Sequence, residues 1–247
     1  LLAVRLSFDT EGVMGDDETV LFAQRSVGDV ADAFPQAVKV FDDAGIDYSC
    51  KGAQTLADAA VAAGYGVEEL IALIEETPAP EDAIEWSQRP LDELARYLAE
   101  DHADMAEKVI PTLRELLESS ARQHSELTNF RRIVTLFASL SATMTMHMVH
   151  EDRDLFSSLA VRNGGANGLP NARLSQRVLR ELVEHATFRE ELRTMRELCL
   201  LVRDDCADEI FCALTEFSRT VHYHMHLENN ILYTRAIDLE NQLRRAS

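Results

Sequence analysis

Apolar residues recur at alternating steps of three and four along the second half of the chain. One such stripe runs through Ile133, Phe137, Leu140 and Met144 and then reaches His147 and Glu151. A second stripe runs through Ile210, Leu214, Phe217 and Val221 and then reaches His224, Glu228 and Ile231. This spacing is typical of a helix face that is turned towards the core of a bundle. Each stripe therefore places a histidine and a glutamate, four residues apart, where apolar core residues are expected.

Four long helices are predicted beyond Pro90. Their expected ranges are 91–119, 125–161, 171–203 and 208–243. The glycine-rich segment 162–170 is a turn by composition, and Pro111 predicts a kink or a break inside the first helix. Because short connections between long helices produce antiparallel neighbours, we predict an all-α fold built on an up-down-up-down four-helix bundle.

A small helical domain is predicted to precede the bundle. Ser26 and Thr55 can each cap a helix, Pro35 can open one, and Gly45 and Gly64 can each end one. The expected organisation is a loosely ordered arm at 1–25, this small module at 26–77, a linker at 78–90 and the bundle at 91–247. Three of the six prolines lie in the linker, where they break helices.

The charge of the chain limits its partners. It carries 43 acidic residues against 24 lysines and arginines, which gives a formal net charge of -19. Nucleic acids and anionic membranes attract proteins through basic patches, so we expect neither as a partner. No apolar run approaches the roughly 20 residues that a membrane span needs.

The cysteines point to a reducing compartment. The four of them are Cys50, Cys199, Cys206 and Cys212, and no two form the CxxC pair of zinc ribbons or thioredoxin-like proteins. They do not resemble a secreted disulfide framework, and the first 24 residues lack the continuous apolar core of a signal peptide. We therefore expect a cytoplasmic protein.

Each of the four predicted bundle helices carries one histidine on its apolar stripe. These residues are His102, His147, His185 and His224. Counting 1.5 Å per residue from the helix ends places the last two within about one turn of each other. Four imidazoles and the carboxylates of Glu151 and Glu228 can therefore share one layer of the core. Such groups are costly in an apolar core unless something compensates their desolvation, and a metal does so well.

Six ligands of this kind suit two metal ions. We expect each ion to take two imidazoles, with the two glutamates bridging ions that lie ~3.5–4 Å apart. Each ion would keep an open position for O₂, NO, peroxide or hydroxide. Mixed imidazole and carboxylate ligation favours iron or manganese, whereas zinc accepts the same atoms but prefers four ligands. A single histidine on an apolar face is usually a satisfied core residue, and it is the phased set of six that favours a metal site.

The remaining candidates near these stripes are interpreted as structural. His222 and His226 fall off the stripe and are predicted to lie at the solvent or at the bundle edge. Met144, Met146 and Met148 are predicted to fill the core, because a thioether is a poor ligand for iron among oxygen donors.

With these residues identified, the chain resembles a known family. The set His102, His147-x-x-x-Glu151, His185 and His224-x-x-x-Glu228 is similar to that of hemerythrin-like domains. The small module, through the stretches 37–41, 45–52 and 54–56, resembles the amino-terminal domain of di-iron proteins that repair iron–sulfur clusters. The resemblance covers about residues 26–240. It implies a non-haem di-iron centre, a cytoplasmic location and a role in recovery from nitrosative or oxidative stress.

The small module departs from the family pattern at one point. The family usually has two adjacent cysteines followed by two glycines, whereas this chain has Ser49, Cys50, Lys51 and Gly52. Chemistry that needs a pair of neighbouring thiols is lost. Cys50 alone remains a candidate nucleophile or iron ligand, with Lys51 favouring its thiolate; the alternative is a thiol without a role.

The favoured function is repair or protection of iron–sulfur clusters by a di-iron protein, with O₂ or NO as the small ligand and iron–sulfur proteins as clients. One alternative is a hemerythrin-like carrier or sensor of O₂ or NO. Another is a di-iron oxidase that consumes peroxide or O₂. The small module favours repair.

Overall fold

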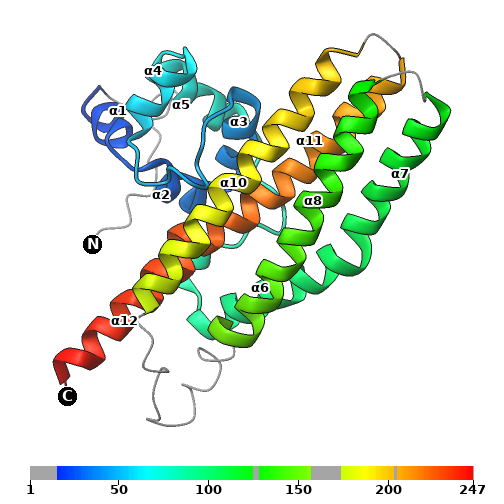
Figure 1. Ribbon diagram of the computed structural model, residues 1–247. Helices are drawn as coiled ribbons and strands as arrows, with labels where there is room; N and C mark the ends of the chain where they lie inside the picture. Colours follow the sequence, from blue (N-terminus) through cyan, green and yellow to red (C-terminus); the bar gives the residue numbers. More distant parts are fainter. Residues whose placement is uncertain (1–15, 125–127, 157–173, 203–204, 247) are drawn as a thin grey trace. The chain divides into compact units, whose positions relative to one another are not determined.

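The computed structural model describes residues 16–124, 128–156, 174–202 and 205–246 (Figure 1). Every regular element within these ranges is a helix, which confirms the all-α prediction. The chain divides into two compact units, residues 1–87 and 88–247. The predicted turn at 162–170 lies outside the described residues.

The first unit is a set of short helices. They are α1 (Asp16–Ala23), α2 (Val27–Ala33), α3 (Gln36–Ala44), α4 (Leu56–Ala63), α5 (Val67–Glu76) and the 3-10 helix η1 (Trp86–Gln88). The expected caps are confirmed: the side chains of Ser26 and Thr55 accept backbone N–H groups at the starts of α2 and α4. Gly45 and Gly64 end α3 and α4 with φ of 71° and 84°, which favours glycine.

Two details of the first unit differ from the prediction. Helix α1 lies within the segment expected to be a loose arm, and Phe22 and Ala23 at its end are buried. Residues 1–15 of that arm lie outside the described residues. The segment expected to be a linker contains η1, whose Trp86 is also buried. In both places, burial of a large apolar side chain stabilises a helix in a segment whose polar or proline-rich composition predicted no regular structure.

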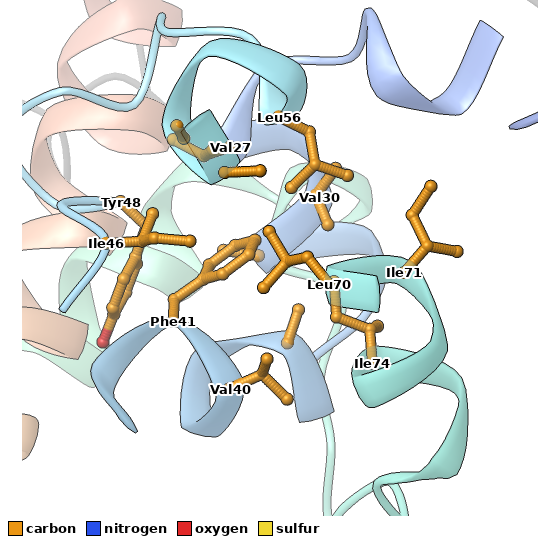
Figure 2. Close-up of a cluster of buried hydrophobic side chains, with 14 of the residues drawn as sticks. Val27, Val30, Val40, Phe41, Ile46, Tyr48, Leu56, Leu70, Ile71 and Ile74 are labelled. Carbon is orange, nitrogen blue, oxygen red and sulfur yellow. The ribbon is translucent and has the colours of Figure 1, made fainter. Parts of the chain in front are cut away.

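The core of the first unit is made by apolar side chains from α2, α3, α4 and α5, with Ile46 and Tyr48 from the connection after α3 (Figure 2). Phe41 is fully buried and lies 5.9 Å from Tyr48 between ring centroids. Burying a side chain of this size stabilises the fold by about 1.5–3 kcal/mol. Ile46 and Tyr48 thus anchor the connection that carries Ser49 and Cys50 in this core.

The second unit is the four-helix bundle. Its elements are α6 (Leu91–Asp104), η2 (Met105–Val109), α7 (Ile110–Gln123), α8 (Thr128–Glu151), η3 (Asp152–Phe156), α10 (Leu174–Leu200), α11 (Asp205–His226), η5 (Leu227–Leu232) and α12 (Tyr233–Ala246). Helices α7 and α10 each pack against both α8 and α11, so the four close into a ring (Figure 1). The antiparallel bundle predicted from the stripes is confirmed.

Within the described part of the bundle, three π-helical segments interrupt the helices: η2, η3 and η5. The first precedes Pro111 and accounts for the interruption expected there. Proline has no N–H to donate, and just before it the Ile110 N–H reaches the Met105 carbonyl, five residues back. The helix therefore widens by one residue at this point and continues.

Among the described residues, the stretch Thr128–Phe156 is the one that by length and composition alone could cross a membrane. It is also the core helix of the bundle that carries His147 and Glu151, and its residues Ile133, Phe137 and Leu140 are fully buried. A core helix of a bundle has this composition for packing reasons.

Candidate metal centre

The six predicted ligands meet in one layer of the bundle core. His102 comes from α6, His147 and Glu151 from α8, His185 from α10, His224 from α11 and Glu228 from η5. All six side chains are buried. The structure therefore brings together every residue that the stripes placed at this depth.

The four imidazoles form two close pairs. The Nε2 atoms of His102 and His224 lie 2.9 Å apart, and those of His147 and His185 also lie 2.9 Å apart. Two imidazole nitrogens at this distance need a proton or a cation between their lone pairs. The first pair joins residues 122 positions apart, on α6 and α11, whereas the second joins the consecutive helices α8 and α10.

Glu228 spans the two pairs. Its Oε1 lies 3.0 Å from His224 Nε2, while its Oε2 lies 3.3 Å from His185 Nε2. The carboxylate thus presents one oxygen to each pair, as expected of a bridging ligand.

Glu151 is placed differently. Its Oε2 lies 3.2 Å from His147 Nε2 and 3.6 Å from His102 Nε2. Its Oε1 accepts a hydrogen bond from the buried hydroxyl of Tyr233. Only one oxygen of Glu151 therefore faces the imidazoles, whereas both oxygens of Glu228 do.

The outer nitrogen of every imidazole has a hydrogen-bond acceptor. His102 donates from Nδ1 to Asp152 at 2.9 Å, and His224 donates from Nδ1 to Asp101 at 2.5 Å. On the other side of the layer, His147 donates to Glu184 at 2.9 Å and His185 donates to Asn229 at 2.7 Å. A proton held on Nδ1 leaves the Nε2 lone pair free to bind a metal, and such partners orient metal-binding histidines in many sites.

The π-helical segments supply some of these outer partners. In η5 the Tyr233 N–H donates to the Glu228 carbonyl, five residues back. A ring of this size places residues five apart on one face, so Glu228 and Tyr233 both point into the site. Asp152 begins η3 directly after Glu151 and reaches His102. Such π turns occur most often at functional sites.

The pKa values of the imidazoles indicate which groups carry positive charge at the site when no metal is bound. Burial lowers the pKa of His147, but the neighbouring carboxylates of Glu151 and Glu181 outweigh this and raise the pKa to about 11. Burial likewise lowers the pKa of His224, while Glu228 and the hydrogen bond to Asp101 raise it to about 10. Without metal, protons on these imidazoles supply the positive charge that the buried carboxylates need.

These shifts predict how the metal-free bundle responds to pH. A histidine whose pKa is raised on folding stabilises the fold fully below its unfolded pKa of about 6.5. That contribution is lost as the pH rises through the folded values for His224 and His147, about 10 and about 11. Burial lowers the pKa of His185 to about 4, so its titration affects stability only below a pH of about 6.5.

We therefore expect the urea midpoint of chelator-treated protein to fall between pH 7 and pH 10. The midpoint of metal-loaded protein should fall less, because metal ions replace the protons. A metal-free midpoint that rises with pH over this range would contradict the assignment.

The donor atoms fit metal ions. They fall into two groups in each of which the donor atoms all lie within 4.8 Å of one another: His147, Glu151, His185 and Glu228, and His102, His224 and Glu228. The Oε2 atoms of Glu151 and Glu228 are buried without a hydrogen-bond partner, a costly arrangement that a cation relieves. A third group, His147 with Glu181 and Glu184, lies around the outer nitrogen of His147 and serves to orient that ring.

A small cavity adjoins the imidazoles. Its volume is about 20 Å³, enough for about one water-sized molecule. Besides His147, His185, His224 and Glu228 it is lined by Met105, Met144, Met148, Phe188, Val221 and Met225. A site of this size and lining admits a small ligand and excludes larger ones.

Some residues near the site differ from the sequence analysis. His222 and His226 are buried, with 8% and 0% exposure, so the expectation of solvent or edge positions is wrong. Their burial means that the helix is covered on more than one side, and the Nδ1 of His226 also lies 2.9 Å from the side-chain amide nitrogen of Asn230. Met144 and Met148 fill the core as expected, whereas Met146 is exposed.

The sequence analysis did not identify the outer partners. Asp101, Asp152, Glu184 and Asn229 each lie next in sequence to one of the six residues. That adjacency was the available signal. Tyr233 lies five residues beyond Glu228 and could be found only by expecting a π turn.

Comparison with known proteins finds a family match for each of the two units. The profile of the Hemerythrin HHE cation binding domain matches residues 93–236, and a profile described as a domain of unknown function (DUF542) matches residues 23–77. An iron-sulfur cluster repair protein YtfE of Pectobacterium carotovorum is 26% identical over 223 residues, covering 87% of this chain and 98% of its own length. The protein of the same name from Yersinia pseudotuberculosis is 28% identical over 225 residues, with the same coverage.

The hemerythrin match covers more than half of the chain and contains all six residues of the layer. Proteins matched by that profile bind cations, and the histidine and glutamate clusters found here are suited to the same task. The chain belongs to the hemerythrin HHE cation binding domain family.

Proposed function

We propose that this protein holds two iron ions in its bundle and acts in the repair or protection of iron–sulfur clusters under nitrosative or oxidative stress. The observation that carries the proposal is the buried layer of four imidazoles and two carboxylates in a chain that also has the small module. Relatives that align with 87% of the chain are named iron-sulfur cluster repair proteins. The cytoplasm, where such clusters are assembled into enzymes, is the proposed location.

The choice of iron follows from the chemistry of the donors. Both groups combine imidazole nitrogens with carboxylate oxygens, and neither contains a thiolate. This mixture suits iron or manganese, whereas zinc accepts the same atoms but prefers four ligands.

Each part of the centre then has a task in this chain. Iron supplies reversible binding and reduction of small molecules such as O₂ or NO. The imidazoles and Glu228 hold the ions, the outer acceptors orient the rings, and the methionine-rich cavity limits access to small ligands. The net charge of -19 argues against nucleic acid as a partner. Iron–sulfur proteins are the proposed clients.

The proposal is tested in two steps. Metal analysis of the purified protein should find two iron ions per chain, and its reduced form should change its absorption on exposure to NO. The loaded protein should then reactivate a cluster enzyme damaged by NO or peroxide, whereas metal-free protein should not. Two bound irons without reactivation would favour a carrier or sensor of O₂ or NO, which the small apolar cavity also suits.

Cys50 provides a sharper test of repair. It is partly buried, and its backbone N–H donates to the Asp47 side chain at 2.8 Å, which fixes the connection that carries it. The six bundle residues supply every proposed ligand. We therefore expect Cys50→Ser to keep both metal ions and the NO-dependent absorption, and to lower only the rate of reactivation. The matched control is Cys212→Ser, an exposed thiol on α11, which should change neither.

A fragment that starts near Asp82 extends the same test. It should retain two metal ions and their absorption bands, because the small module contributes no proposed ligand. Loss of metal from Cys50→Ser would make Cys50 a ligand and would contradict the bundle site. Unchanged reactivation would leave the thiol without a role and would favour the carrier or sensor.

A further inference from the structure

The two segments that carry Glu151 and Glu228 have similar sequences over ten residues. Residues 147–156 and 224–233 both have His, Met, Glu and Leu at their first, second, fifth and ninth positions. The sixth positions are Asp152 and Asn229, and the tenth positions are Phe156 and Tyr233. In each repeat a π-helical segment follows or contains the glutamate. The bundle is thus built from two similar halves.

The contacts repeat along with the sequence. Asp152 accepts from His102, and Asn229 in the other half accepts from His185. The ring of Phe156 stacks on His102 with centroids 5.3 Å apart, and the ring of Tyr233 stacks on His185 with centroids 6.2 Å apart. The two imidazole pairs are therefore held by corresponding residues in corresponding ways.

One hydroxyl group breaks this correspondence at the ligands. The Tyr233 hydroxyl donates to Oε1 of Glu151, across the layer from its own half. Phe156 has no such group to offer to Glu228, whose two oxygens remain directed at the two imidazole pairs. The outcome is a group of four donors around His147 and His185 and a group of three around His102 and His224.

We propose that Tyr233 is a positioning residue that makes the two metal positions unequal. By holding one oxygen of Glu151, it leaves the His102–His224 position with fewer protein ligands than the His147–His185 position. This inference rests on the proposed two-metal centre. It assigns the asymmetry of the centre to a side chain that binds no metal itself.

The test compares Tyr233→Phe with the unchanged full-length protein, both loaded with ⁵⁷Fe and studied by Mössbauer spectroscopy. Phenylalanine already occupies the equivalent position in the other half, where it is buried and stacked on a ligand, so the substitution suits this fold. The unchanged protein should show two quadrupole doublets of equal area, and azide should shift one of them. In Tyr233→Phe the two doublets should move together, and azide should no longer distinguish them.

Tyr97→Phe is the matched control, because it removes a phenol hydroxyl from a partly exposed position on α6. Its spectrum should match that of the unchanged protein. A single doublet in the unchanged protein, or two unaltered doublets in Tyr233→Phe, would overturn the role of Tyr233. Fewer than two irons per chain in the unchanged protein would instead refute the two-metal centre. Two irons with the expected spectra but no repair activity would leave this inference standing and refute only the proposed function.

Discussion

Replacing Glu228 by glutamine is expected to remove both metal ions from the protein. The two oxygens of this carboxylate face the two imidazole pairs, 3.0 Å from His224 and 3.3 Å from His185. An amide of the same shape loses the charge and turns one donor nitrogen towards a cation. Mutation of a residue that only hydrogen-bonds to a metal ligand commonly lowers metal affinity 10–100-fold. Because Glu228 is itself a proposed ligand, we expect its metal affinity to fall by at least about 100-fold.

The measurement is the metal content of purified variants after dialysis, followed by titration with ferrous iron under anaerobic conditions. Glu216→Gln is the control, since Glu216 is exposed on the same fourth helix. Glu151→Gln should have a smaller effect, because only one oxygen of Glu151 faces the imidazoles. If Glu228→Gln retained both ions, the carboxylate would not be a shared ligand.

Removing the metals from the unchanged protein is expected to cause the largest loss of stability. Each bound ion stabilises the fold by about 4 kcal/mol at a thousandfold excess over its dissociation constant. For a bundle of this size the loss of both ions corresponds to a fall in Tm on the order of 15–30 °C. Protons on His147 and His224 offset part of the cost, so the fall should be larger at alkaline pH.

Calorimetry with and without a chelator measures this effect directly. The small module contributes no proposed ligand, so a transition that belongs to it should not move, and it serves as an internal reference. Unchanged midpoints after verified removal of the metals would mean that water satisfies the buried carboxylates.

Much of this architecture could be predicted from local chemistry. The capping side chains of Ser26 and Thr55 and the left-handed Gly45 and Gly64 determine helix ends through contacts within a few residues. The apolar stripes could be recognised because a bundle helix needs apolar residues at alternating steps of three and four on the face that packs against the core. The arm was misjudged because Phe22 is ordered by the distant apolar residues of its unit, which no local pattern reveals.

The residues that gather at the candidate site could be predicted, and their individual contacts less so. Helical periodicity places His147 and Glu151 on one face, and the depth of each helix brings four imidazoles together. A π turn shifts that periodicity by one residue, so the inward position of Tyr233 could not be foreseen. The burial of His222 and His226 depends on how the helix is covered beyond its own stripe, which sequence spacing does not determine.

The pairing of the imidazoles also has a consequence for how the chain reaches its final state. Each close pair takes one histidine from α6 or α8 and one from α10 or α11, and the two members of the His102–His224 pair are 122 residues apart. The His147–His185 pair joins the consecutive helices α8 and α10 and can form before the fourth helix docks, whereas the His102–His224 pair joins the first helix to the last and needs the whole bundle. Filling of the His102–His224 position is then a late event in folding, and an ion bound there acts as a reversible cross-link that closes a long loop.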